Sequence, residues 1–294
     1  MYLPKRRENK SNRGPTTASW QYTGKFWVSC RVQFGYRYPG FPGQLVGHTT
    51  ILKFEELVPD TSTRNSLETT TSIMPEVIIN GPDGRLECKY QPGRKPNAPI
   101  ALMLHPHPQH GGTMNNKVVY TLYQIFLQRG FACMRFNFRG VGRSQGTFAR
   151  GEGELSDAAA ALDWLQSYNE NAPQCWIAGF SFGAWIGMQL LMRRPEITSF
   201  VSVAPPANMY DFSFLAPCPS SGLFLSGDLD DIVPPDSIET LVGKLRQQRG
   251  IEIDHHTIGG ANHFFHEKLE ELEQTVGQYL DRSMVENAEQ AVIG

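Results

Sequence analysis

Two short stretches of this 294-residue sequence carry a serine between glycines in the pattern G-x-S-x-G. In the first, Gly142–Gly146, the serine is Ser144, and in the second, Gly179–Gly183, it is Ser181. A serine in this pattern can act as a nucleophile when it lies on a sharp turn between a strand and a helix, because glycines let that turn close. Only the second serine has a strand-like run before it and a helix-like stretch after it. We therefore expect Ser181 to be a nucleophile and Ser144 to be a turn residue.

A nucleophilic serine needs a base to take its proton, and the base needs an acid to orient it. His263 lies in a glycine-rich segment that we expect to be a loop before the last helix. Two other histidines, His255 and His256, fall inside a predicted strand, and His266 is expected on a helix surface. His263 is therefore the expected base.

Acidic side chains follow an apolar run at 222–226, which we predict to be a strand. They are Asp228, Asp230 and Asp231, and their position after the strand leaves all three open as the orienting acid. Serine, acid and histidine thus occur in this chain order, each after a successive predicted strand. This is the order that serine hydrolases built on an open α/β sheet use.

The segments that must position these side chains alternate between short apolar runs and stretches with helical periodicity. The expected strands are 77–80, 86–90, 100–105, 132–138, 174–178, 200–203, 222–226 and 251–258, and the expected helices are 117–128, 154–168, 182–193, 236–248 and 265–282. This alternation indicates a mostly parallel, doubly wound sheet of about eight strands with helices on both faces. The first two strands are joined by a turn too short for a crossover, so they should form an antiparallel hairpin.

The start of the chain differs in composition from the rest. Residues 1–73 begin with a basic stretch, continue into a Ser- and Thr-rich one and have no apolar periodicity. We expect them to be a disordered extension, or a mis-assigned start with Met74 as the true first residue, and a targeting peptide is the remaining alternative. The folded domain should occupy 74–294.

Composition limits the partners and the compartment. The formal net charge is −2, which gives no reason to expect nucleic acid or an anionic membrane as a partner. We find neither an apolar run near the ~18 residues of a membrane span nor the apolar region of a signal peptide. We expect a cytoplasmic protein. A reducing cytoplasm also suits five scattered cysteines without a C-x-x-C pair. The oligomeric state is left open. The cysteines are Cys30, Cys88, Cys133, Cys175 and Cys218.

Two longer motifs carry a resemblance to a known superfamily. They are "HPHPQHGGTMNN" at His105–Asn116 and "RFNFRGVGRSQG" at Arg135–Gly146. With the motifs above, they make the chain similar to α/β hydrolases over roughly 74–282, most closely to small bacterial serine hydrolases without a lid (the dienelactone-hydrolase and serine-aminopeptidase-like group). The resemblance implies the α/β-hydrolase fold with no lid domain. It also implies that Asn137, where related hydrolases often carry Asp, is not a catalytic acid.

The same resemblance selects one of the three aspartates. The family's acid occurs in a G-x-x-D-x-x-x-P frame, which Gly227 and Pro234 set in this sequence. The frame implies Asp230 as the acid rather than its two neighbours. The family's histidine stands in a context like "GANHFF", which matches Gly260–Phe265.

The loop "LHPHPQHGG" at 104–112 follows the third predicted strand. In an α/β hydrolase, the oxyanion of acyl transfer needs one backbone N–H from the residue after the nucleophile and one from this loop. The first is expected to be that of Phe182. Proline has no N–H, so His107 is the only donor within 106–108 and the expected second donor. A zinc site at H-x-H-x-x-H is the alternative, although the prolines hinder convergence of three imidazoles and no acidic ligand is near.

These features predict a serine hydrolase that cleaves a carboxylic ester, thioester or peptide-type acyl bond through an acyl-enzyme, with no cofactor or metal. An acyltransferase using the same triad and a non-catalytic binding protein of the same fold are the alternatives. The segment between Ala204 and Gly222 is too short for a lid domain, so we expect an open pocket and a small or exposed substrate. Tyr210, Phe212 and Phe214 are candidate pocket walls, with plain packing as the alternative.

Overall fold

The computed structural model describes the backbone of residues 76–293 and the side chains of 76–285. The expectations for residues 1–73, and for Cys30 within them, concern a segment outside the described residues. The domain expected over 74–294 is therefore discussed for its described part.

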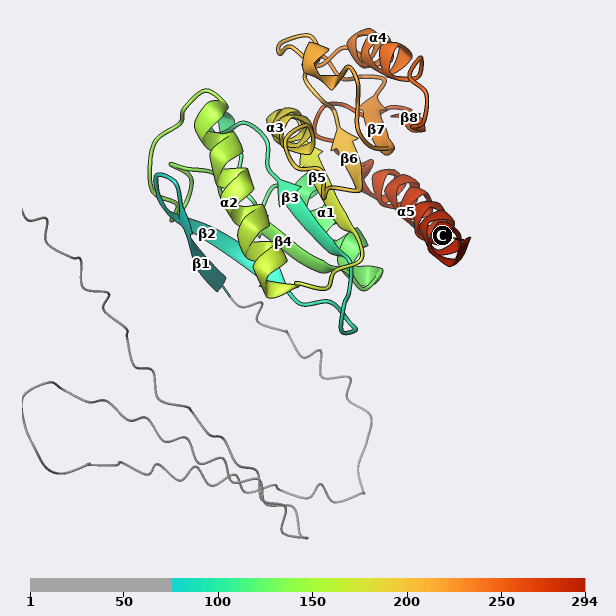
Figure 1. Ribbon diagram of the computed structural model, residues 1–294. Helices are drawn as coiled ribbons and strands as arrows, with labels where there is room; N and C mark the ends of the chain where they lie inside the picture. The colour runs from blue at the N-terminus through green and yellow to red at the C-terminus, as the bar shows by residue number, and fades with distance from the viewer. Residues whose placement is uncertain (1–75, 294) are drawn as a thin grey trace, which may run out of the picture. The chain divides into compact units, whose positions relative to one another are not determined.

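Eight strands form one sheet in the order β1-β2-β4-β3-β5-β6-β7-β8 (Figure 1). They are β1 (Glu76–Gly81), β2 (Gly84–Gln91), β3 (Ile100–Leu104), β4 (Ala132–Phe136), β5 (Cys175–Phe180), β6 (Ser199–Val203), β7 (Gly222–Gly227) and β8 (Ile253–Ile258). Strand β2 is antiparallel to both of its neighbours, β1 and β4, and the other pairs are parallel. The mostly parallel sheet of eight strands and its initial hairpin are thus confirmed.

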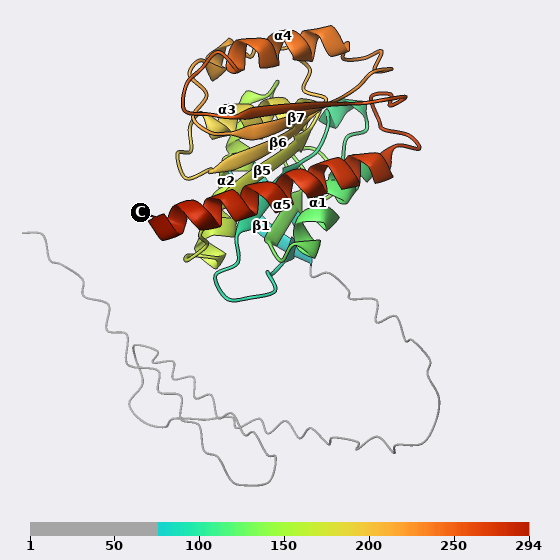
Figure 2. The same cartoon turned by 90° about the vertical axis from the view of Figure 1, so that its right-hand side faces the viewer.

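Helices cover both faces of the sheet, as Figure 2 shows with α3 and α4 on one side and α1 and α5 on the other. The helices are α1 (Lys117–Gln128), α2 (Glu152–Tyr168), α3 (Phe182–Leu191), α4 (Pro235–Leu245) and α5 (Leu269–Ile293). Two separate apolar clusters result, one under α2, α3 and α4 and the other under α1 and α5. The central strands β3, β5 and β6 are buried along their whole length, which explains why they read as continuous apolar runs.

The start of the last helix differs from the prediction. Helix α5 was expected from residue 265 but begins at Leu269. Phe265 and Glu267 have φ angles of 52° and 60°, and this left-handed backbone cannot continue a right-handed helix. His266, expected on the helix surface, is therefore an exposed residue of the loop that precedes α5.

The connection between β6 and β7 holds no lid domain. Residues 204–221 contain only a short 3-10 turn, η2 (Ser213–Leu215). None of the described helices combines the length and the hydropathy that crossing a bilayer requires. The four cysteines in the described part are free and buried. Burial raises the pKa of Cys88 and of Cys175 to about 12, so these thiols stay protonated.

Candidate active site

Ser181 lies between β5 and α3 on a turn that forces its backbone into an unusual conformation. Its φ and ψ are 54° and −120°, a region that serine adopts only when its surroundings enforce it. A Cβ atom on Gly179 would lie 2.6 Å from the Ala184 nitrogen, and one on Gly183 would lie 2.6 Å from the His105 carbonyl oxygen. Both glycines of the G-x-S-x-G motif are therefore required for β5 and α3 to approach this closely.

The structure brings together three side chains that the sequence distributes over three loops. His263 Nε2 lies 3.0 Å from Ser181 Oγ, and His263 Nδ1 lies 2.8 Å from Asp230 Oδ2. His263, Ser181 and Asp230 are 3%, 9% and 4% exposed, respectively, so water does not screen these contacts strongly. With Nδ1–H donating to the carboxylate, Nε2 is free to accept the proton of the Ser181 hydroxyl.

The Asp230 carboxylate is itself held by backbone groups. Its Oδ1 accepts hydrogen bonds from the N–H of Ile232 at 2.9 Å and of Val233 at 2.7 Å. The other oxygen, Oδ2, is thereby left to face His263. Asp228 has a different partner. Its Oδ1 accepts a hydrogen bond from the Gly260 N–H, on the loop that carries His263.

The competing candidates lie apart from this arrangement. Ser144 Oγ donates to the Asn137 carbonyl oxygen at 2.7 Å and accepts from the Glu87 N–H at 2.9 Å, which agrees with a turn residue. His255 Nε2 lies 3.0 Å from Ser226 Oγ, across β7 and β8. The remaining candidates are exposed, namely Asp231, His256 and His266.

In the described part of the chain, the two backbone N–H groups expected to bind an oxyanion have no protein partner. Among the described residues, neither the N–H of Phe182 nor that of His107 has a hydrogen-bond acceptor, although both residues border the cavity in front of Ser181. The loop after β3 closes because the N–H of Gly112 donates to the His107 carbonyl oxygen at 3.0 Å. A Cβ on Gly112 would lie only 2.6 Å from that oxygen, so the turn requires glycine.

A cavity of about 410 Å³ lies in front of the Ser181 hydroxyl. Its apolar walls include Pro206, Met209, Tyr210, Ile232 and Phe264. Among the described residues, its lining includes no Asp, Glu, Lys or Arg, and its polar side chains are those of Ser181, Asn116 and three histidines. The space beside the candidate nucleophile is therefore uncharged apart from the histidines.

Only one of the three aromatic residues proposed as pocket walls lines this cavity. Tyr210 does, with its ring stacked on Trp185 at 4.2 Å between centroids. Phe212 and Phe214 do not line the cavity, in keeping with the packing alternative. Their rings stack on each other at 5.9 Å and pack against the apolar cluster on the α3 side of the sheet, so they contribute to the core and not to the pocket.

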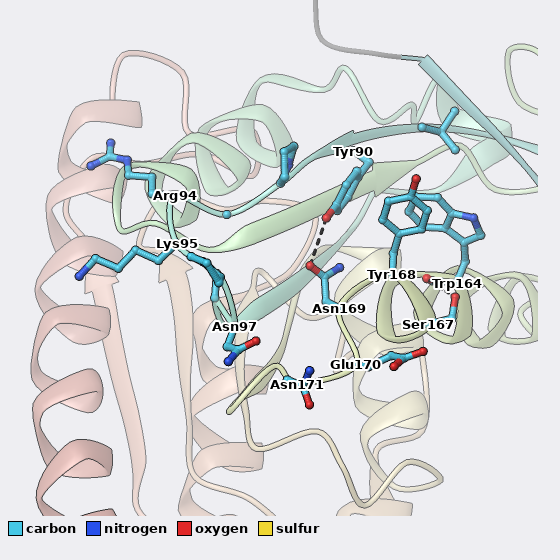
Figure 3. Close-up of a pocket in the computed structure, with 15 residues that line it drawn as sticks. Tyr90, Arg94, Lys95, Asn97, Trp164, Ser167, Tyr168, Asn169, Glu170 and Asn171 are labelled. Atoms are coloured by element: carbon cyan, nitrogen blue, oxygen red, sulfur yellow. Dashed lines mark hydrogen bonds between the residues drawn. The ribbon is translucent and has the colours of Figure 1, made fainter. Parts of the chain in front are cut away.

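A larger cavity, of about 950 Å³, lies between the segment that follows β2 and the end of α2 (Figure 3). Its aromatic side chains are Tyr90, Trp164 and Tyr168, and the Tyr90 hydroxyl donates to Asn169 Oδ1 at 3.1 Å. It adjoins the segment that leads into β3, at the amino ends of the parallel strands, whereas Ser181 lies at a carboxyl end. Chemistry in open α/β sheets occurs at the carboxyl ends, so the smaller cavity is the candidate active site.

The histidines of the H-x-H-x-x-H stretch do not converge. Both ring nitrogens of His105 are engaged inside the protein, Nε2 by the Phe138 N–H at 3.0 Å and Nδ1 by the Pro106 carbonyl oxygen at 2.6 Å. The rings of His107 and His110 lie beside each other outside it, 4.5 Å apart. In the part of the chain that the structure describes, no three His, Cys, Asp or Glu side chains are arranged to hold a metal ion.

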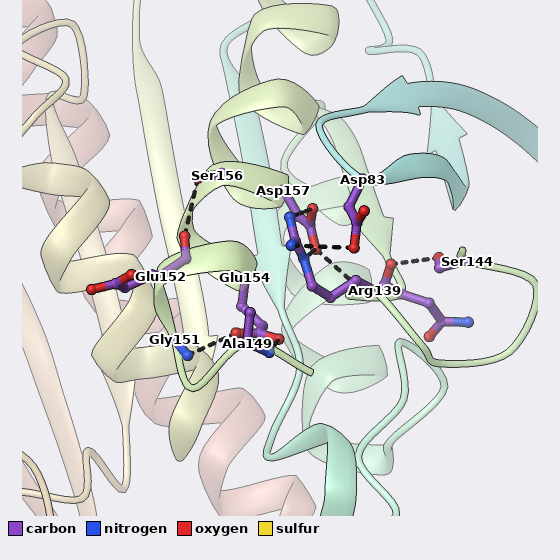
Figure 4. Close-up of polar contacts among 10 residues, drawn as sticks. Asp83, Arg139, Ser144, Ala149, Gly151, Glu152, Glu154, Ser156 and Asp157 are labelled. Atoms are coloured by element: carbon purple, nitrogen blue, oxygen red, sulfur yellow. Dashed lines mark hydrogen bonds and ion pairs between the residues drawn. The ribbon is translucent and has the colours of Figure 1, made fainter. Parts of the chain in front are cut away.

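A buried ion pair anchors the loop that follows β4 (Figure 4). The Arg139 guanidinium donates to both carboxylate oxygens of Asp157 in α2, at 2.9 and 2.7 Å, and the Asp157 side chain is fully buried. The Glu154 carboxylate accepts from the N–H groups of Ala149 and Gly151. The pairing of Arg139 with Asp157 was not predicted, because the two residues lie 18 positions apart and no local pattern marks it.

The anchored loop carries Phe148 to the candidate site. Its ring lies 4.8 Å from the ring of His107 and 6.0 Å from that of Phe182, the two residues whose N–H groups have no acceptor among the described residues. Phe148 thus packs against both sides of the expected oxyanion site. Its only sequence signal was an aromatic residue inside a polar, glycine-rich loop.

Comparison with known proteins agrees with this architecture. The family model described as X-Pro dipeptidyl-peptidase (S15 family) matches residues 87–289. An uncharacterized protein of Rickettsia prowazekii is 56% identical over 211 residues, which cover 70% of this chain and 89% of that protein. A crystal structure from Agrobacterium tumefaciens, of a protein of unknown function described as a candidate α/β hydrolase, is 61% identical with a TM-score of 0.70, covering 71% of this chain and 96% of that one. A Xanthomonas campestris α/β serine hydrolase without a lid is 32% identical with a TM-score of 0.65, covering 71% and 94%.

Proposed function

The chain belongs to the S15 family, described as X-Pro dipeptidyl-peptidase, and to the α/β-hydrolase superfamily, and on this premise we propose that it is a serine hydrolase that cleaves a carboxylic ester or thioester of a small, uncharged acyl group. The observation that carries the proposal is the hydrogen-bonded series of Ser181, His263 and Asp230 beside a cavity whose described lining has no Asp, Glu, Lys or Arg. A strained serine with this series has no use in a protein that only binds.

In the proposed mechanism, His263 Nε2 takes the hydroxyl proton as Ser181 Oγ attacks the carbonyl carbon. The Asp230 carboxylate holds the tautomer of the ring and stabilises the imidazolium. The negative oxygen of the tetrahedral intermediate accepts hydrogen bonds from the N–H groups of Phe182 and His107. His263 then gives its proton to the leaving group, and the acyl group stays on Ser181. Water, deprotonated by His263, attacks this acyl-enzyme and releases the acid.

The composition of the cavity supports an ester or thioester over the dipeptidyl substrate in the family description. A dipeptidyl-peptidase cleaves near a free amino terminus, so its substrate brings an ammonium group close to the scissile bond. Burying that charge without a carboxylate partner is costly. The described lining contains neither Asp nor Glu, whereas its proline, methionine and aromatic side chains suit an apolar acyl chain.

Labelling with a fluorophosphonate probe tests the nucleophile. The wild-type chain should react, Ser181→Ala should not, and Ser144→Ala should react like the wild type, because Ser144 only supports a turn. A folded wild-type chain that fails to react would support a non-catalytic binding protein instead.

A substrate panel tests the proposed class. We expect turnover of short p-nitrophenyl esters and of matched thioesters, with kcat/KM decreasing as the acyl chain outgrows the cavity. Dipeptidyl anilides ending in proline should be poor substrates. A preference for these anilides over the esters would contradict the assignment while leaving the nucleophile intact.

A further inference from the structure

His105 follows β3 and is fully buried, yet it is not part of the hydrogen-bonded series around Ser181. A backbone N–H can only donate, so the contact of 3.0 Å from the Phe138 N–H makes His105 Nε2 an acceptor. Burial lowers the pKa of His105 to about 3, so the ring is neutral near pH 7. A neutral imidazole with an accepting Nε2 carries its hydrogen on Nδ1. That hydrogen is donated to the Pro106 carbonyl oxygen, 2.6 Å away.

This carbonyl belongs to the same peptide group as the N–H of His107. The Pro106–His107 peptide is trans, and in a trans peptide the C=O and the N–H point in opposite directions. The oxygen is held on the interior side by His105, so the N–H must leave on the other side. His107 borders the cavity in front of Ser181, and its N–H has no acceptor among the described residues.

We propose that His105 is a positioning residue for the oxyanion site. By donating a hydrogen bond to the Pro106 carbonyl oxygen, it fixes the plane of the Pro106–His107 peptide. The N–H of His107 then faces the reacting carbonyl group. The inference rests on the proposed function of Ser181. Orientation matters here because donors stabilise a developing oxyanion best when they already point at its position and need not reorganise during the reaction.

The same histidine ties the loop to the rest of the site. Through Phe138 its ring is anchored to the segment just after β4, the neighbouring strand. Through its carbonyl oxygen it packs against Gly183, where any Cβ would lie 2.6 Å away. Gly183 is in the first turn of α3, one residue after Phe182, which supplies the other donor. Both donors therefore belong to one rigid unit.

Two isosteric substitutions separate the two hydrogen bonds of His105. The side-chain amide of Asn can place its nitrogen near the position of Nδ1, so His105→Asn keeps a donor for Pro106 and loses the acceptor for Phe138. The longer Gln can place its oxygen near Nε2, so His105→Gln keeps the acceptor for Phe138 and loses the donor for Pro106. His255→Gln serves as a control, since its ring bonds Ser226 between β7 and β8.

The readout is the ratio of kcat for a p-nitrophenyl oxo-ester to kcat for the matching thiono-ester, in which sulfur replaces the carbonyl oxygen. Sulfur is a weak hydrogen-bond acceptor, so the thiono-ester gains little from the oxyanion donors. Because both rates refer to the same preparation, the ratio is independent of the fraction of protein that is folded. A loss of stability alone therefore cannot change it.

We expect His105→Gln to lower the oxo-ester kcat and the ratio by about tenfold to hundredfold, with little change in KM, since complete removal of an oxyanion donor costs about 10²–10³. His105→Asn should recover most of the ratio, and His255→Gln should leave it unchanged. An unchanged ratio in His105→Gln, or an equal fall in both His105 variants, would overturn the inference alone. A wild-type chain without Ser181-dependent turnover would overturn the proposed function and this inference with it.

Discussion

Asp230 and Asp228 lie two positions apart after β7, but their carboxylates have different partners. Asp230 is buried, receives two backbone N–H groups and contacts His263. Asp228 is exposed and receives the Gly260 N–H. The sequence alone left the aspartates of this stretch open, and only the motif frame of the related hydrolases selected one. The choice depends on which carboxylate the turn after β7 directs at the histidine, and the spacing of residues does not encode this direction.

The pair offers a matched test of the orienting acid. Asp230→Asn should lower kcat by about 10⁴, because an amide can stabilise the wrong tautomer of His263 and cannot balance the imidazolium charge. Asp228→Asn should stay within about threefold of the wild type, since an amide oxygen can still accept from Gly260. Steady-state kinetics on a p-nitrophenyl ester would measure both, and equal losses would argue against the distinct role of Asp230.

Protonation of His105 should make stability depend on pH. Its pKa is about 3 in the folded chain and about 6.5 when unfolded, so between these values the unfolded state binds one more proton. The free energy of unfolding should therefore be fully retained above pH 6.5 and should fall by about 1.4 kcal/mol per pH unit as the pH decreases toward 3.

Urea unfolding of the wild type and of His105→Gln at several pH values between 4 and 7 would measure this contribution as a difference. The other titrating groups are common to both proteins, and their contributions largely cancel in that difference. The gap in stability between the two proteins should narrow as the pH falls. A gap that stays constant would mean that His105 is not buried in its neutral form.

At the level of elements, the junction of β5 and α3 depends on the absence of side chains. Gly183→Ala should destabilise the fold by about 1–3 kcal/mol and reduce turnover, because the new Cβ would press against the backbone at the end of β3. Gly243→Ala is the matched control. This exposed glycine lies within α4 with nothing near its Cβ position, so alanine should stabilise the protein by about 1 kcal/mol. Urea denaturation would measure both changes, and the same sign for the two would contradict this account.

The elements themselves could be read from the sequence where the signal is local. The apolar runs of β3 and β5, the periodicity of α1 and the strand–serine–helix context of Ser181 are all properties of neighbouring residues, and they were recognised. The start of α5 was not, because nothing in the sequence marks Phe265 as a residue with positive φ. The contact of His105 with Phe138 and those of Phe148 with His107 and Phe182 were also missed, since each joins residues more than 30 positions apart.

For the whole molecule, every described strand and every candidate site residue lies after residue 75. A chain that begins at Met74 should therefore keep the melting temperature of the full chain and its kcat. Thermal unfolding and ester hydrolysis of the two proteins, purified in parallel, would compare them. A large decrease in melting temperature on truncation would indicate that residues 1–73 contribute to the stability of the domain.

The short connection between β6 and β7 has a kinetic consequence for any acyl group carried by Ser181. Residues 204–221 supply Pro206, Met209 and Tyr210 to one wall but no domain that could seal the cavity. Among the described residues nothing seals this cavity, so we expect water to reach an acyl group on Ser181 throughout its lifetime. An alcohol or thiol acceptor would have to bind well enough to outcompete water at its full concentration, so partitioning of the intermediate should favour release of the free acid.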